Sequence, residues 1–139
     1  MQTKTFGHFR LIPIPCSAQE ENEHLRAFII SFINEPSRVH YQQALIERRV
    51  ALNSALEELE QRLDTQYCRL IKDADGFLQR PARSTLGIYL DGQEGPYKIT
   101  ALDAGTISNW QGCDAIFSVD VGRMAMFFSR KGYALGCKR

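Results

Sequence analysis

Leucines recur at a seven-residue spacing over residues 37–73, a stretch that contains neither glycine nor proline. The two series, offset by four residues, are Leu45, Leu52 and Leu59, and Leu56, Leu63 and Leu70. Together they place a continuous apolar seam along one side of a helix. The pattern therefore predicts one long helix over about residues 37–73, ending at the Asp73–Gly76 turn.

A second helix precedes this one. Ser17 and Glu20 have the spacing of a capping box, in which the hydroxyl and the carboxylate each accept a hydrogen bond from a backbone amide. The apolar stripe that follows stops before Pro36, because the residue before a proline disfavours helix. The short connection predicts that the two helices form an αα-hairpin. Residues 4–14 are expected to form an N-terminal strand, ended by proline.

After Gly76 the hydrophobic period changes to two, which is typical of half-buried strands. Strands are expected over residues 85–90, 97–102, 115–121 and 124–129, with a short edge at 133–135 and a polar loop over 103–114. The run 124–128 also fits a helix, since a short apolar run does not settle its own period. The chain is thus predicted to be one α+β domain, residues 1–139, with a largely antiparallel β-meander.

The amino-acid composition indicates the class of protein but does not identify a function. The chain has 139 residues, 44% hydrophobic and 24% charged, and a net charge of +1. This is ordinary for a globular protein, and no global field draws the chain to nucleic acid or membrane. No apolar run approaches the roughly 20 residues of a membrane span, and the first residues lack the continuous apolar run that is typical of a signal peptide. Four widely spaced cysteines suit free thiols, so we expect a cytoplasmic protein.

The far half of the predicted long helix outruns its only helical neighbour. If the sheet does not cover this half, a second copy of the chain must cover it, or an apolar patch stays exposed. The sequence therefore predicts a homodimer. Its interface would consist of Leu56, Leu59, Leu63 and Leu70.

The loop at 103–114 is the best candidate for a partner-binding surface. It combines hydrogen-bonding side chains with the only tryptophan, a residue type enriched at binding hot spots. The proposed contact residues are Asp103, Ser108, Asn109, Trp110 and Gln111. Alternatively, Trp110 packs under the loop and fills the edge of the core. We expect the partner to be another protein.

Nucleic acid is the alternative partner. The C-terminal strip combines basic residues with aromatic ones, a mixture that suits single strands. Its members are Arg123, Arg130, Lys131, Tyr133 and Lys138, with Phe127 and Phe128 between them. The balanced overall charge weakens this hypothesis.

A small enzyme is the third hypothesis. It would use Cys113 as a nucleophile, or a pair of the aspartates at strand ends for acid–base chemistry. These aspartates are Asp91, Asp103, Asp114 and Asp120. No phosphate-binding glycine motif, GxSxG elbow or HExxH pattern occurs, and neither a cofactor nor a metal site is expected. We therefore expect a non-enzymatic accessory, adaptor or inhibitor protein that acts as a homodimer.

Overall fold

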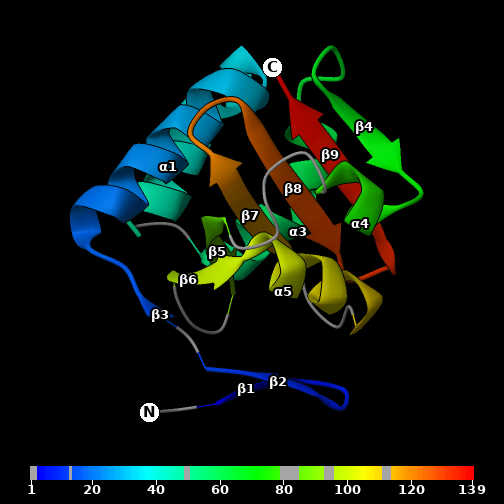
Figure 1. Ribbon diagram of the computed structural model, residues 1–139. Helices are drawn as coiled ribbons and strands as arrows, with labels where there is room; N and C mark the ends of the chain where they lie inside the picture. Colours follow the sequence, from blue (N-terminus) through cyan, green and yellow to red (C-terminus); the bar gives the residue numbers. More distant parts are fainter. Residues whose placement is uncertain (1–2, 13, 49–50, 79–84, 93–95, 111–113) are drawn as a thin grey trace.

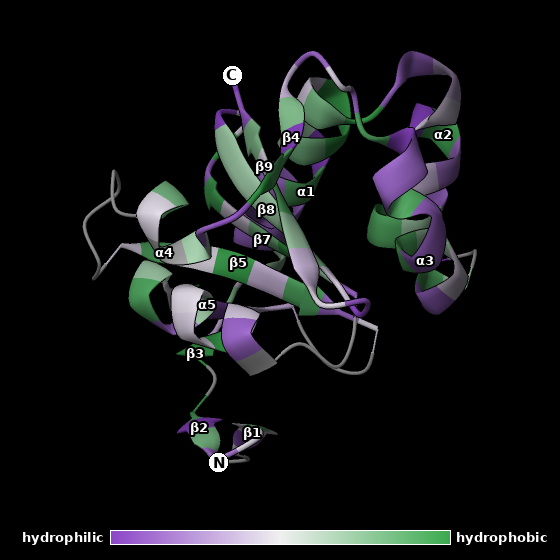
Figure 2. Ribbon diagram, turned by 90° about the vertical axis from the view of Figure 1, so that its right-hand side faces the viewer, coloured by the Kyte–Doolittle hydropathy of each residue, from purple (hydrophilic) through white to green (hydrophobic). Residues whose placement is uncertain are grey.

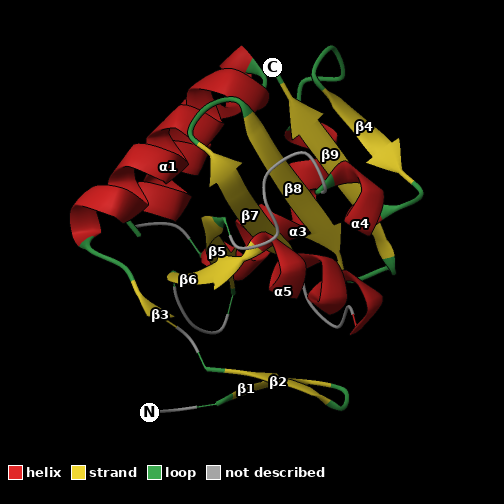
Figure 3. Cartoon of the chain, viewed as in Figure 1, coloured by secondary structure: helices red, strands yellow, loops and turns green. Residues whose placement is uncertain are grey.

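The computed structural model describes residues 3–12, 14–48, 51–78, 85–92, 96–110 and 114–139. Its centre is a seven-stranded antiparallel sheet with helices on both faces (Figures 1 and 3). In spatial order the strands are β3 (Ile14–Pro15), β6 (Tyr97–Thr100), β5 (Leu86–Asp91), β7 (Ala115–Asp120), β8 (Met124–Ser129), β9 (Tyr133–Lys138) and β4 (Cys68–Ile71). The predicted α+β class with a largely antiparallel sheet is confirmed.

The N-terminal strand expected over residues 4–14 is instead a hairpin. Strands β1 (Lys4–Phe6) and β2 (Phe9–Leu11) form a separate two-stranded sheet. The chain turns between them at Gly7, whose φ of 59° is accessible to glycine at little cost. In Figure 1 this hairpin lies apart from the main sheet, at the N-terminal end of the chain.

Helix α1 (Ala18–Phe32) begins as the sequence predicts. The Ser17 hydroxyl accepts a hydrogen bond from the Glu20 amide at 3.1 Å, and the Glu20 carboxylate accepts one from the Ser17 amide at 3.2 Å. Its buried stripe consists of Leu25, Phe28, Ile29 and Phe32. A short 3-10 turn, η1 (Glu35–Ser37), contains Pro36 and separates this helix from the next segment.

The single long helix over residues 37–73 is wrong. The chain forms α2 (Arg38–Tyr41), the π-helix η2 (Gln42–Ile46) and, after a break, α3 (Leu52–Arg62). Arg48 lies at the break with a φ of 57°, and its Nε donates to the Leu45 carbonyl at 3.0 Å. A left-handed residue that caps the last carbonyls ends a helix. The seven-residue spacing of the leucines does not predict this turn.

The last part of the predicted helix is an edge strand. Leu63 is extended and pairs with Ile33 in a β-bridge, and the amide of Cys68 donates to the Asp64 carbonyl at 2.9 Å. From there β4 pairs with β9 along its whole length. Helical propensity over residues 68–71 is overridden by this tertiary pairing, as propensity is a weak prior. The expected short edge at 133–135 is therefore an inner strand.

The opposite face of the sheet carries α4 (Ala74–Phe77), α5 (Ala101–Ile107) and the 3-10 turn η3 (Ser108–Trp110). The predicted end of the long helix at Asp73–Gly76 is thus the start of α4. The expected loop over 103–114 is wrong over residues 103–110, which are helical, and residues 111–113 lie outside the described part of the chain. Thr100 caps α5 by accepting a hydrogen bond from the Asp103 amide at 3.1 Å. In Figure 2 the helices α2 and α3 lie on one side of the sheet, with α4 and α5 on the other.

Two apolar cores lie on the two faces of the sheet, because successive strand residues point to opposite sides. Ile116 and Phe127 pack with the helices α1 and α3, whereas their neighbours Phe117 and Phe128 pack with α4, α5 and the hairpin. All six residues of β8 are buried, which explains why its sequence shows no period. Within the described ranges, no helix has the combination of length and apolar character that crossing a bilayer demands.

Candidate functional site

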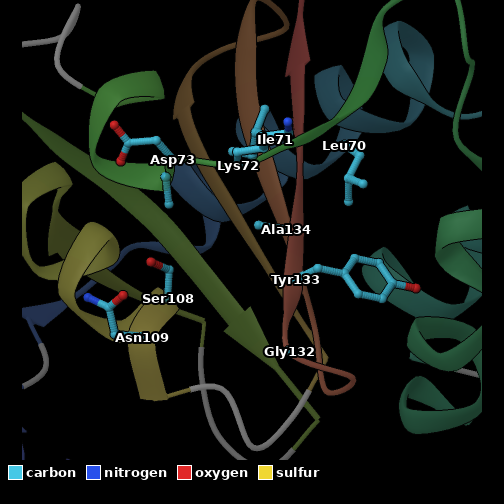
Figure 4. Close-up of a pocket in the computed structure, with 10 residues that line it drawn as sticks. Leu70, Ile71, Lys72, Asp73, Ser108, Asn109, Gly132, Tyr133 and Ala134 are labelled. Carbon is cyan, nitrogen blue, oxygen red and sulfur yellow. The ribbon is translucent and has the colours of Figure 1, made fainter.

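A pocket of about 410 Å³ lies where β4 leaves the sheet and the chain turns into α4. Its walls come from the end of β4 and the start of α4, from η3, and from the start of β9. The lining residues are Leu70, Ile71, Lys72, Asp73, Ala74, Ser108, Asn109, Gly132, Tyr133 and Ala134. Figure 4 shows Asp73, Ser108 and Asn109 on one side of β9, and Leu70 and the Tyr133 ring on the other. The pocket therefore wraps around the edge of the sheet.

The edge strand β4 contributes Leu70 and Ile71 to the lining of this pocket. The Lys138 amide donates to the Tyr67 carbonyl at 3.0 Å, so Tyr67 and Lys138 are a hydrogen-bonded pair of the β4–β9 ladder. In an antiparallel pair every second residue bonds to the partner strand, so Arg69 and Ile71 face β9. Leu70 lies between them and directs its backbone N–H and C=O away from β9. Its side chain is 65% exposed.

Polar groups in the pocket walls are held by neighbouring elements. The Tyr133 hydroxyl donates to Oε2 of Glu60 on α3 at 2.7 Å, and this hydrogen bond raises the pKa of Tyr133. The Ser108 hydroxyl donates to the Gly105 carbonyl at 2.6 Å. Opposite them, α4 packs closely on β9, since a Cβ on Gly136 would come within 2.6 Å of the Phe77 ring. The walls are therefore fixed by contacts outside the pocket.

The predicted partner-binding residues are only partly brought together. Ser108 and Asn109 line the pocket, whereas Asp103 belongs to the first turn of α5 and is not among the lining residues. Gln111 and the side chain of Trp110 lie outside the described part of the structure. Of the predicted surface, the polar pair Ser108 and Asn109 is therefore the part that reaches the candidate site.

The basic strip is divided between the two ends of β8, since Lys138 pairs with Met124 next to Arg123, whereas Arg130 and Lys131 follow Ser129. Arg130 pairs with Glu57 at 2.7 Å and with Asp114 at 3.5 Å, and the nearby Glu57 raises its pKa. Tyr133 is bonded to Glu60, while Arg123, Lys131 and Lys138 are exposed. The interleaved aromatics Phe127 and Phe128 are 2% and 1% exposed. They are therefore not available to stack on bases in the folded chain.

The leucines proposed for a dimer interface are mostly covered by the chain itself. Leu56, Leu59 and Leu63 are at most 3% exposed and belong to the core between α3 and the sheet. The sheet thus buries the three leucines that the dimer hypothesis expects a second copy of the chain to bury. Of the four leucines, Leu70 alone remains exposed, and it lies on β4 rather than on a helix.

Two of the four strand-end aspartates, Asp91 and Asp114, form ion pairs with basic residues. Asp91 is buried and forms an ion pair with Lys4 of the hairpin, whose ammonium also lies 5.6–5.7 Å from the ring centroids of Phe6, Tyr89 and Tyr97. Asp114 pairs with Arg130 and also accepts a hydrogen bond from its amide. Cys113 lies outside the described residues. In the described part of the chain no three His, Cys, Asp or Glu side chains gather as metal ligands.

Comparison of the chain with models of known protein families, with curated proteins and with solved structures returns no match. The candidate site therefore rests on its own geometry.

The sequence pattern does not predict the wall formed by Leu70, Ile71 and Lys72, because the leucine spacing places these residues on a helix. One signal was present: β-branched, aromatic and apolar residues increase after Asp64, and Asp64 itself begins a turn, since its carboxylate accepts from the Gln66 amide at 2.9 Å. That signal marks a helix end but does not reveal which strand the next segment joins.

Proposed function

We propose that the chain is a non-enzymatic protein-binding protein, an accessory, adaptor or inhibitor, that adds an extended segment of its partner to the free edge of β4. One observation carries this proposal. Leu70 turns its backbone groups away from β9 and exposes 65% of its side chain beside the pocket. Strand addition uses such an edge for main-chain hydrogen bonds and uses adjacent pockets for side chains.

The geometry also favours a particular chemistry for the segment. Its side chains would alternate between the Leu70 and Tyr133 side and the Ser108 and Asn109 side of the edge. Arg69 and Lys72 are both exposed beside Leu70. Basic side chains on an edge strand repel a basic strand and would lose hydration on pairing with a neutral one, which protects against aggregation. An extended segment that carries aspartate or glutamate and one apolar residue opposite Leu70 fits best.

A second copy of the chain fits this edge less well. Two β4 strands paired antiparallel about Leu70 would place Arg69 of each copy opposite Ile71 of the other and bring the two Arg69 side chains into diagonal positions on one face, where their like charges repel. Homodimerisation remains a prediction that light scattering tests. A mass twice the 15.8 kDa of the chain, lost on Leu70→Pro, would assign the edge to a second copy.

We also propose that the protein is cytoplasmic, because Cys16, Cys68 and Cys137 form no disulfide in the structure, as is usual in a reducing compartment.

The experiment compares two substitutions of the same residue. Leu70→Pro removes the outward N–H but no hydrogen bond to β9, and proline is tolerated at such an edge position. Leu70→Thr keeps the N–H and the strand propensity. Immobilised wild-type chain is incubated with nuclease-treated lysate of its own host. We expect at least one protein to be retained by wild type and by Leu70→Thr, and lost with Leu70→Pro. Retention that is identical for all three chains contradicts the proposal.

Nucleic-acid binding stays the alternative, through the exposed Arg123, Lys131 and Lys138. It predicts an affinity for single-stranded RNA or DNA that falls steeply between low and physiological salt. Lys131→Ala and Lys138→Ala would weaken that binding, and Leu70→Pro would not. The two functions are thus separated by which variant loses its partner.

A further inference from the structure

Cys68 of β4 and Cys137 of β9 lie directly opposite each other in the strand register. The neighbouring pair Tyr67 and Lys138 is hydrogen-bonded, so the cysteine pair occupies a position without backbone hydrogen bonds between its members. At such positions the Cα atoms are about 4.5 Å apart and the side chains lie on the same face. This spacing falls within the range of roughly 4.4–6.8 Å that disulfides span.

Both thiols are shielded in the resting protein. Cys68 is 4% exposed and Cys137 is 0% exposed, and both belong to the core that α1 and α3 form on the sheet. A hydrogen bond with Cys68 and burial raise the pKa of Cys137 well above its usual value. Because the thiolate is the reactive form, the closed pair is reduced and slow to react at neutral pH.

The strand that carries Cys68 is nevertheless an edge strand of the sheet. Strand β4 has four residues, and within the described chain it has a strand neighbour on one side only. Edge elements with few hydrogen bonds open locally at a fraction of the cost of global unfolding. Cys16 is placed differently: its thiol lies 3.3 Å from the Pro96 carbonyl, beside the β3–β6 edge at the other end of the sheet. It is not positioned to compete for either partner.

We infer that Cys68 and Cys137 form a reversible disulfide that fastens the edge strand β4 to β9 when a disulfide oxidant such as oxidised glutathione is present. When β4 opens, the thiolate of one cysteine attacks a glutathione sulfur, a new S–S bond forms, and one glutathione thiolate leaves. On reclosure the second cysteine thiolate attacks the protein sulfur of this mixed disulfide and releases the second glutathione. Two protein thiols lose two electrons, the glutathione disulfide gains them, and the two protons end on the released thiols.

This inference concerns the strand itself and does not rest on the proposed function. The bond would join the two strands beside Arg69 and Ile71, whose amides bond to β9. Local opening that breaks the β4–β9 pairing would then be suppressed. The oxidised chain should accordingly show slower amide hydrogen exchange at these two residues than the reduced chain does.

The test uses the full chain in a Cys16→Ser/Cys113→Ser background, which leaves the two strand cysteines as the only thiols. After equilibration with oxidised glutathione, thiols are counted by alkylation under denaturing conditions and the mass is measured. We expect no alkylatable thiol and a mass lower by about 2 Da, for the two hydrogens removed. The rate of disulfide formation should rise about tenfold between pH 7 and pH 8, because the fraction of thiolate rises by about the same factor. Reduction should restore both thiols.

Two results would overturn the inference. One is a chain whose two thiols remain alkylatable, and the other is a lasting mixed disulfide with glutathione on either cysteine. Cys68→Ala in the same background is the control and should give only the mixed adduct. If the serine background does not fold, peptide mapping of the oxidised wild-type chain decides. A linked peptide pair containing Cys68 and Cys137 supports the inference, and a linkage through Cys16 or between two chains contradicts it.

Discussion

The hydroxyl of Tyr133 donates a hydrogen bond to Oε2 of Glu60 across 2.7 Å, and so joins the first residue of β9 to helix α3 beside the pocket. Tyr133→Phe removes this bond and should lower the free energy of unfolding by about 0.5–1.5 kcal/mol. Tyr67→Phe is the matched control, because its hydroxyl accepts only a 3.4 Å bond from the exposed Arg139. Equal denaturation midpoints for both variants would show that the Glu60 contact does not hold the strand.

Thr100 caps α5, and its loss should destabilise that helix. The Thr100 hydroxyl accepts from the Asp103 amide at 3.1 Å, so Thr100→Ala should cost about 1 kcal/mol of unfolding free energy. Thr106 lies within the same helix, and its hydroxyl donates a hydrogen bond to the Leu102 carbonyl. Thr106→Ala removes this bond but no helix cap. It should cost less than half as much. A chemical denaturation curve for each variant measures the difference, and the reverse order would contradict the cap.

The sequence predicts the start of helix α1 but not the start of helix α5. Ser17 with Glu20 and Thr100 with Asp103 have the same spacing, and both form caps. The first is followed by a long apolar stripe and is readily recognised. The second is followed by Ala104 and Gly105, which add little apolar periodicity, so the sequence pattern predicts a loop there. Short helices thus escape a reading that relies on periodicity, even where the cap is present.

The long-helix error has a different cause. Leu45, Leu56, Leu59 and Leu63 do share one core, as their spacing predicts, but they reach it from separate helical segments and from an extended residue. The turn depends on the left-handed backbone of Arg48, a residue with no intrinsic preference for that conformation. Likewise, Leu70 belongs to a strand because β9 lies beside it. The turn at Arg48 and the strand at Leu70 both depend on tertiary contacts, so neither can be predicted from the local sequence.

Leu56→Ala and Ile30→Ala test the placement of the first core. Leu56 is 1% exposed between α3 and the sheet, whereas Ile30 on α1 is 61% exposed. Removing the buried leucine should cost about 2–5 kcal/mol, and the exposed isoleucine about 0.5 kcal/mol or less. Thermal and denaturant unfolding measure both. Comparable losses at the two positions would mean that the helices are not packed on the sheet as described.

His24 should make the protein less stable in mild acid. Its Nδ1 lies 2.7 Å from Oγ of Ser118, and burial lowers its pKa, although Glu23, Glu20 and Asp120 act in the opposite direction. Because the unfolded chain binds a proton more readily, this contribution is present above about pH 6.5 and is lost as the pH falls through the lowered pKa. His24→Asn should therefore flatten the pH dependence of unfolding between about pH 7 and 5.

The exposed His40 provides the control for that measurement. His40→Asn should leave the slope of stability against pH in this window unchanged. An identical slope in wild type, His24→Asn and His40→Asn would show that His24 is not the group responsible.

Amide hydrogen exchange along β4, with and without the captured partner, tests the central claim most directly. In the free chain the Leu70 amide should exchange at least tenfold faster than those of Arg69 and Ile71, since only the latter two bond to β9. Addition of the partner should slow exchange at Leu70 to the level of its neighbours. A partner that binds while the Leu70 amide keeps its rapid exchange would contradict strand addition at this edge.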